Sequence, residues 1–342
     1  MRNNFQAQIT KVSNITSSNT RNLYICFSKS INEVDNVVWY KINPSYSTGS
    51  DDQIPSISSV CSIPVSQVGY GFRPAFIGSK IYMIGGSRDI DSHGSKDVYC
   101  VDTQCDDESL VPRKLHIDTL ANRQGSATVS THGKIYVFGS VYWKKTEPWA
   151  EVFDPSMNQW FPLPDPPNEL HQACQTIFHV VVGDTILLSY DETLASFDVK
   201  TNSWCLLSTP LTDSPFWNFG ATTLDDLLFM FHSCSVIAYD VVTNKWFKEP
   251  VRGLELEYMS FLSPIALIHG YVVHLGDKNL CVIWYDEFEG GDEEFCVRCV
   301  KFRVSTIYDA EIEEEVLQAE VQARSAYRMR SGGDFLVDCF PI

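Results

Sequence analysis

Basic residues are scarce in this sequence, which has 26 Lys and Arg residues against 43 Asp and Glu residues and a formal net charge of −17. That balance argues against the phosphate backbone of nucleic acids and against anionic membrane surfaces as partners. Long apolar runs are also missing, since none approaches the roughly 18 residues that a membrane-spanning helix needs. Met1–Phe5 lacks the apolar core of a signal peptide. We therefore expect a cytoplasmic or nuclear protein that binds neither nucleic acid nor membrane.

The residue patterns of common enzyme sites are missing too. The chain has no glycine-rich loop with phosphate-binding spacing and no Gly-x-Ser-x-Gly sequence around a nucleophile. Cys296 and Cys299 form a lone C-x-x-C pair, and in a strand their thiols would point to opposite faces, so a zinc site is not expected. The 11 cysteines follow no disulfide framework, which favours reduced thiols. We predict a protein that is not an enzyme, with no catalytic residues, no cofactor and no metal.

What the sequence does have is a repeated hairpin pattern, first clear in Trp149–Pro164. An aspartate follows an aromatic residue, five turn-forming residues come next, and a tryptophan ends the pattern at Asp154–Trp160, Asp198–Trp204 and Asp240–Trp246. The aspartates follow one another at intervals of 44 and 42 residues (198 − 154 and 240 − 198), and a period of roughly 40 to 50 residues indicates a propeller or a solenoid. We expect each aspartate to hydrogen-bond the turn behind it and each tryptophan to fill the space between neighbouring sheets.

Around these hairpins the chain divides into six similar units of about four strands. Each unit has a strand of small apolar residues, a turn, a continuous apolar run that ends in glycine, a long loop and a final hairpin of the Asp-x5-Trp kind. Continuous apolar runs belong to strands that are buried on both faces, and four-stranded antiparallel sheets arranged around an axis form a propeller. We therefore predict an all-β fold, a six-bladed β-propeller that forms a single domain over residues 21–342 after a polar segment at residues 1–20.

Two details of this propeller depend on the last part of the chain. Apolar residues alternate over Leu317–Ala323, which favours a strand over a helix as the fourth strand of the last unit. Pro264–Ile268 has no clear place and is an alternative first strand of that unit. We place the final apolar run, Phe335–Phe340, beside Leu23–Phe27, so that strands from both chain ends complete the first blade.

Several segments resemble kelch repeats. The resemblance lies in Ile81–Gly86 and Ile135–Gly139, followed by Val152–Asp154 and Trp160, and the diglycine of kelch units is kept only at Gly85–Gly86. Together with the ending Phe335–Cys339, these segments look more narrowly like plant F-box/kelch-repeat proteins, over about residues 21–340. The resemblance implies a kelch-type propeller and a non-catalytic role as the substrate-recognition domain, or substrate adaptor, of a ubiquitin ligase.

The same resemblance raises two further points. In that family a three-helix F-box precedes the propeller and binds a Skp-type adaptor, whereas here the first strand begins near Leu23. We therefore expect an F-box-less relative or a fragment, with no docking of a Skp-type adaptor by these residues.

The alternative function is a metal-dependent kelch-propeller enzyme, of the oxidase or specifier type. The sequence shows neither the copper ligand set of the oxidases nor the Glu-x3-Asp-x3-His pattern of the specifier proteins.

Partner binding is expected on one face, where the loops between the second and third strands lie beside the connections from blade to blade. Loops on a rigid scaffold carry function, and aromatic and arginine side chains are the usual anchors of protein interfaces. The residues predicted for this partner-binding loop face are Arg88, His93, Arg123, Tyr142, Trp143, Lys144, His171, Trp217 and Tyr258. Its basic groups would suit an acidic peptide. For Arg123 and Trp217 the alternative is that they pack the start of an inner strand.

Overall fold

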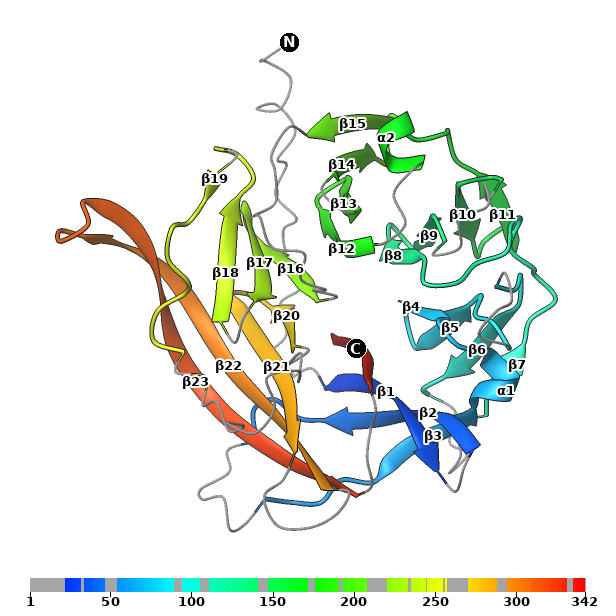
Figure 1. Cartoon of the computed structure of the whole chain (residues 1–342), viewed down its shortest axis with the longest axis horizontal. Coiled ribbons are helices and arrows are strands. Elements are labelled where there is room, and N and C mark those ends of the chain that lie inside the picture. The colour runs from blue at the N-terminus through cyan, green and yellow to red at the C-terminus, as the bar shows by residue number, and fades with distance from the viewer. Residues whose placement is uncertain are drawn as a thin grey trace. The chain divides into compact units, whose positions relative to one another are not determined.

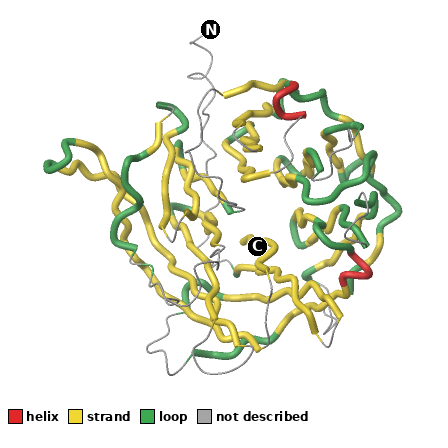
Figure 2. Tube along the Cα trace, in the orientation of Figure 1, coloured by secondary structure: helices red, strands yellow, loops and turns green. Residues whose placement is uncertain are grey.

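The computed structural model of this chain describes most of residues 22–341. The described ranges are 22–31, 34–46, 54–88, 94–104, 111–140, 147–171, 176–190, 193–207, 220–232, 235–243, 245–254, 256, 270–287, 294–330 and 335–341. Figures 1 and 2 show that these residues are mostly strands, with two short helices, α1 (Val65–Val68) and α2 (Asn168–His171). No helix in these ranges is long and apolar enough to cross a membrane.

The strands within the described ranges form six four-stranded sheets, each the size of one propeller blade. In the first blade the order is β24 (Phe335–Pro341), β1 (Leu23–Ile31), β2 (Val34–Ile42) and β3 (Ser59–Pro64). The second blade contains β4 (Arg73–Ile77), β5 (Lys80–Ile84), β6 (Val98–Asp102) and β7 (Arg113–Lys114). The third contains β8 (Ala127–Thr131), β9 (Lys134–Phe138), β10 (Ala150–Asp154) and β11 (Gln159–Pro162).

The other three blades repeat this order. The fourth contains β12 (Thr176–Val182), β13 (Thr185–Tyr190), β14 (Thr193–Asp198) and β15 (Ser203–Leu207). The fifth contains β16 (Ala221–Leu224), β17 (Leu227–His232), β18 (Ser235–Asp240) and β19 (Lys245–Trp246). The sixth contains β20 (Gly270–Gly276), β21 (Asn279–Glu287), β22 (Glu294–Asp309) and β23 (Glu314–Arg330).

This arrangement confirms the predicted fold class, an all-β six-bladed propeller of four-stranded antiparallel blades. The strand at the C-terminal end, β24, lies beside β1 in the first sheet, so strands from both chain ends complete one blade as predicted. Leu317–Ala323 lies within the fourth strand of the sixth blade, also as predicted. Pro264–Ile268, the alternative first strand of that blade, lies outside the described residues, and β20 takes that place.

The chain separates into two compact units. The first unit contains Met1–Phe27, Tyr40–Ser59 and Asn218–Ile342, and the second contains Ser28–Trp39 and Val60–Trp217. The fifth and sixth blades therefore belong to the first unit, and the second, third and fourth blades to the second unit. The division of the chain into a polar segment and a single domain stays a prediction.

Within each unit the core lies between neighbouring blades. In the second unit, Tyr82 and Ile84 of β5 pack with Phe153 and Trp160 of the third blade. Phe138 of β9 packs in turn with residues of the fourth blade. In the first unit the equivalent cluster joins the fifth and sixth blades through Phe229, Phe231, Val282, Trp284 and Phe302. Burying aromatic and aliphatic side chains of this size contributes roughly 1.5–3 kcal/mol each, which accounts for the continuous apolar runs in the sequence.

The aspartate of each repeated hairpin hydrogen-bonds its own turn, as predicted. Asp154 Oδ1 accepts a bond of 2.9 Å from the backbone N–H of Ser156. Asp198 Oδ1 accepts bonds of 2.9 and 2.8 Å from the next turn residues, and Asp240 Oδ1 accepts bonds of 2.8 and 2.9 Å in the same way. In the first two turns an asparagine four residues after the aspartate has a positive φ, 52° at Asn158 and 55° at Asn202. Asparagine tolerates this conformation better than most residues do, which explains its place in the pattern.

The tryptophans of two hairpins fill the space between neighbouring blades, and this confirms their predicted role in the second unit. Trp160 is buried against the second blade, and its Nε1–H donates a bond of 3.1 Å to the carbonyl oxygen of Ile117. Trp204 donates a bond of 2.9 Å to the carbonyl oxygen of Pro164, and its ring meets Phe138 of the third blade with 5.6 Å between centroids. Each indole therefore ties its hairpin to the preceding blade by packing and by one hydrogen bond.

Candidate functional site

The diglycine of the second blade brings two connections of the chain together. Gly85 and Gly86 follow β5 with φ values of 71° and 93°. The N–H of Gly86 donates a bond of 2.8 Å to the carbonyl oxygen of Arg123, in the segment that leads to β8. A Cβ atom at Gly85 would lie 2.2 Å from that same oxygen, so only glycine permits this approach. A backbone bridge between Ser95 and Arg123 continues the contact.

In the second blade, therefore, the loop between the second and third strands lies beside the segment that leads to the third blade. The sequence predicted that these two kinds of connection share a face. We take this place, the loop after β5 together with the segment from β7 to β8, as the candidate functional site.

Arg123 anchors the base of this site from within. Its side chain is fully buried, and its Nε donates a bond of 2.7 Å to Oε1 of Glu151, which is also fully buried. The two Nη atoms donate bonds of 2.8–3.0 Å to backbone carbonyl oxygens, those of Gly139, Pro148 and Trp149. The second carboxylate oxygen of Glu151 accepts a bond of 2.7 Å from the N–H of Leu120. A buried charge is tolerated where it is paired and hydrogen-bonded in this way.

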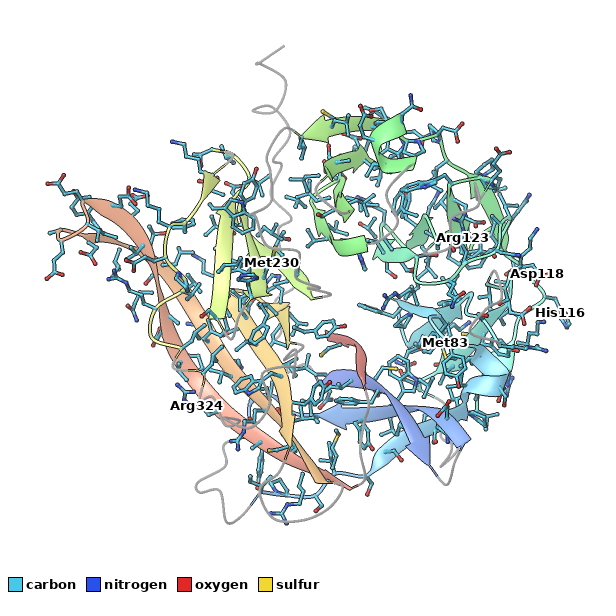
Figure 3. All side chains as sticks on the ribbon, viewed as in Figure 1. Met83, His116, Asp118, Arg123, Met230 and Arg324 are labelled. Atoms are coloured by element: carbon cyan, nitrogen blue, oxygen red, sulfur yellow. The ribbon has the colours of Figure 1, made fainter. Side chains whose placement is uncertain are left out.

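The prediction that Arg123 contacts a partner is therefore wrong, and the alternative, that it packs the start of an inner strand, is correct. Exposed and buried residues alternate along the segment that carries Arg123. His116 and Asp118 are exposed, whereas Arg123 points inward (Figure 3). Burial removes its guanidinium from any partner's reach. Its role is to fix the connection to β8 onto the third blade.

Above this buried base, three charged side chains meet at the surface. Asp97 Oδ1 lies 2.7 Å from Lys114 Nζ, and its Oδ2 lies 3.6 Å from Arg88 Nη2. The Arg88 side chain is 66% exposed. The hydrogen bond with Asp97 raises the pKa of Lys114 above its usual value. Arg88 and Lys114 thus lie on either side of Asp97, and the carboxylate of Asp118 also acts on Lys114.

The other predicted residues of the partner-binding loop face are placed only in part. Arg88 is exposed, and its contact with a partner stays a prediction. His171 is the last residue of α2, and the position of its side chain lies outside the description. The remaining residues also lie outside the described ranges, and for them the face stays a prediction: His93, Tyr142, Trp143, Lys144, Trp217 and Tyr258.

Three residues of the site were not singled out from the sequence. Glu151 carried a signal, because a lone carboxylate within the apolar strand Ala150–Phe153 needs a buried partner. Asp97 and Lys114 carried no such signal in the sequence, because each is one of many charged residues in polar segments. Their contact arises only when β7 pairs with β6.

A second polar group lies where three inner strands of the second unit run side by side. His179 of β12 is near Arg73 of β4 and hydrogen-bonds the backbone at Thr128 of β8. Burial, reinforced by the positive charge of Arg73, lowers the pKa of His179 to about 4. This imidazole is therefore neutral at pH 7.

Metal-ligating side chains do not gather anywhere in the described ranges, where no group of three or more His, Cys, Asp or Glu residues is arranged to hold a metal ion. Cys296 and Cys299 both lie in β22 and are buried. Burial raises the pKa of the neighbouring Cys281 well above its usual value, and Cys299 reinforces that rise. The Cys281 thiol is therefore protonated at pH 7.

Six four-stranded blades with a diglycine packed against the next connection define a kelch-type β-propeller. The comparisons with known proteins agree. The family model described as "FKB95, Kelch-repeats domain" matches residues 37–321, and the chain belongs to this family. Among solved structures, that of YjhT is similar with a TM-score of 0.52, 15% identity and coverage of 86% of this chain and 98% of the other. At that identity the likeness concerns the fold alone.

Two curated relatives are plant proteins. A putative F-box/kelch-repeat protein of Arabidopsis thaliana is 24% identical over 230 residues, which cover 65% of this chain and 53% of the relative. A kelch repeat-containing protein of the same plant is 25% identical over 242 residues, covering 66% of this chain and 55% of the relative. The chain thus spans about half the length of the curated relatives that it matches.

Proposed function

We propose that this chain is a protein-recognition propeller, and that it serves as the substrate-binding part of a ubiquitin-ligase receptor in the cytoplasm or nucleus. Membership of the kelch-repeat family supports the general role in protein interaction. The names of the F-box/kelch relatives support the finer role as a receptor.

The observation that carries the proposal is the exposed basic patch of Arg88 and Lys114 around Asp97. The buried pair of Arg123 and Glu151 lies beneath the same connections, so the patch is held on a rigid base. Functional groups on loops recognise partners best when the scaffold holds them in place. A guanidinium and an ammonium group side by side fit a partner segment that carries Asp, Glu or phosphorylated residues.

The test compares the wild-type chain with a double variant, Arg88→Ala with Lys114→Ala, in binding to a library of acidic peptides displayed on phage. We expect the double variant to bind the selected peptides at least about tenfold more weakly, because both charge-assisted contacts are lost. The matched control is Arg113→Ala, which removes an exposed cation of the same strand from the neighbouring position. Equal loss in the control, or none in the double variant, would reject this patch as the binding site.

The receptor role needs a separate measurement. A tagged chain is purified from Arabidopsis tissue and scored for subunits of a cullin complex. Recovery of those subunits together with an acidic partner supports a ligase receptor. Recovery of the partner without them restricts the function to protein binding. The predicted aromatic anchors are tested in the same experiment by Tyr142→Ala with Trp143→Ala, for which we expect the partner to be lost while the thermal midpoint is unchanged.

A further inference from the structure

The long hairpin of the sixth blade repeats the local structure of the aspartate hairpins. Asp309 Oδ1 accepts a bond of 2.8 Å from the backbone N–H of Glu311, as Asp154 does in its own turn. Glu313, four residues after the aspartate, has a φ of 56°, close to the values at Asn158 and Asn202. Tyr308 therefore occupies the place of the aromatic residue before the aspartate, and Glu315 occupies the place of the tryptophan.

The aromatic residue before the aspartate is exposed in this hairpin, whereas it is buried in the other three. Phe153, Phe197 and Tyr239, which precede the aspartates of the other three hairpins, are all 3% exposed or less. Each is paired across the strands with a tryptophan, whereas Tyr308 is paired with Glu315 and is 66% exposed. A single exposed apolar residue is ordinary. Here an aromatic residue that has a core role in three copies of the pattern is presented to solvent in the fourth.

The reason is the length of the two strands. The pairing of β21 with β22 ends at Phe302, whereas the pairing of β22 with β23 continues to Asp309 and Glu314. Figure 1 shows these two strands, in orange and red, running on together to a turn at their end. We call residues 307–315 the hairpin tip. It also exposes Ile307 at 40% and Ile312 at 39%. Ile307 and Tyr308 are consecutive in β22 and therefore point to opposite faces of the hairpin.

The charge of the hairpin tip is strongly negative. Asp309–Glu315 contains five acidic residues and no basic one. Two of them are paired with the segment that follows β19: Asp309 pairs with Arg252, which also pairs with Glu249, and Glu314 pairs with Lys248. The other three, Glu311, Glu313 and Glu315, form no ion pair with any described residue. The two ion pairs hold the turn in place. Glu315 lies directly across the strands from Tyr308, and Glu311 and Glu313 stand on either side of Ile312 in the chain.

We propose that the hairpin tip is a docking site for a basic peptide segment of a partner protein, one that places apolar side chains on Tyr308 and Ile312 and Lys or Arg side chains on Glu311, Glu313 and Glu315. An aromatic anchor with a charged rim is the usual composition of a small interface, and the charge selects a basic partner. A second copy of this chain is disfavoured, because each copy carries a net charge of −17. The hairpin tip shares no residue with the Arg88 patch, which favours acidic partners. Either proposed binding site can therefore be rejected by experiment without affecting the other.

The experiment uses the full chain and a random phage-displayed peptide library. The most enriched peptide is synthesised with a fluorescein label, and its affinity is measured by fluorescence anisotropy. One variant, Tyr308→Ser with Ile312→Ser, removes apolar contacts, and the other, Glu311→Lys with Glu313→Lys, reverses charge. The matched control is Val242→Ser, which removes an exposed apolar side chain from the equivalent turn of the fifth blade.

We expect the enriched peptides to be rich in Lys and Arg, and their affinity to fall at least about tenfold in both tip variants and to be unchanged in the control. The affinity for the wild-type chain should also fall as salt is raised. The proposal is overturned if no peptide is enriched, if the enriched peptides are not basic, or if both tip variants bind like the wild type. It is also overturned if light scattering finds a wild-type dimer that the serine variant converts to a monomer, since the tip would then join two copies. Should the serine variant not fold, the charge-reversal variant alone decides.

Discussion

Replacing Glu151 with glutamine tests the buried ion pair most directly. The substitution keeps the shape of the side chain but leaves the charge of Arg123 without its counter-ion in a fully buried place. Breaking a buried pair from one side costs about 3–5 kcal/mol. Since the amide oxygen of glutamine still accepts one bond from Arg123, and three carbonyl oxygens remain as acceptors, we expect the lower end, about 3 kcal/mol. That is a large part of the roughly 5–15 kcal/mol by which a typical domain is stable.

The free energy of unfolding is measured by urea denaturation, followed by tryptophan fluorescence. Glu169→Gln is the control, because it removes a carboxylate from an exposed position of α2 in the same unit, and we expect a change of about 0.5 kcal/mol or less. The double variant Arg123→Met with Glu151→Leu should lose less than the sum of the two single changes, because it leaves no unpaired charge. A loss below about 1 kcal/mol for Glu151→Gln would refute the reasoning, since the pair would then not be enclosed as described.

Two further predictions concern the same unit. The pKa of His179 is about 4 in the folded chain and about 6.5 when unfolded, so between these values the unfolded chain binds the extra proton. The free energy of unfolding therefore falls as the pH drops below about 6.5, and His179 accounts for about 2 kcal/mol of this loss between pH 7 and 5. Urea titrations of His179→Gln at the two pH values should show a loss that is smaller by that amount. Gly85→Ala should lower the thermal midpoint far more than Gly78→Ala, because an added Cβ meets the Arg123 carbonyl at 2.2 Å in the first and nothing within 4 Å in the second. Equal shifts in midpoint would contradict the close approach.

The parts of the fold that could be predicted from sequence are those whose cause is local. Asp154, the turn behind it and Trp160 lie within seven residues, so their pattern is visible in the chain and recurs. The same logic failed for the sixth blade, where Glu315 replaces the tryptophan. The turn at Asp309 keeps the backbone conformation of the repeat, but without its most recognisable residue the pattern could not be seen.

The candidate site was harder to predict because its contacts join distant residues. Arg123 and Glu151 are 28 positions apart. From the sequence alone, an arginine is equally compatible with a surface anchor and with a buried ion-pair partner. The burial of Arg123 follows from the diglycine, which draws the connection to β8 against the end of β5. The patch of Arg88, Asp97 and Lys114 has no sequence pattern at all, since it depends on how two loops meet.

The position of β24 beside β1 has a consequence for synthesis on the ribosome. Within the first sheet, β1 is made before the other five blades, whereas β24, its neighbour on one side, is made after them. Until residues 335–341 leave the exit tunnel, that side of β1 has its backbone N–H and C=O groups unpaired, and such strand edges promote aggregation. Nascent chains of this protein should therefore depend on chaperones until β24 has been made, and a stop codon shortly before Phe335 should be far more harmful than the loss of one strand suggests.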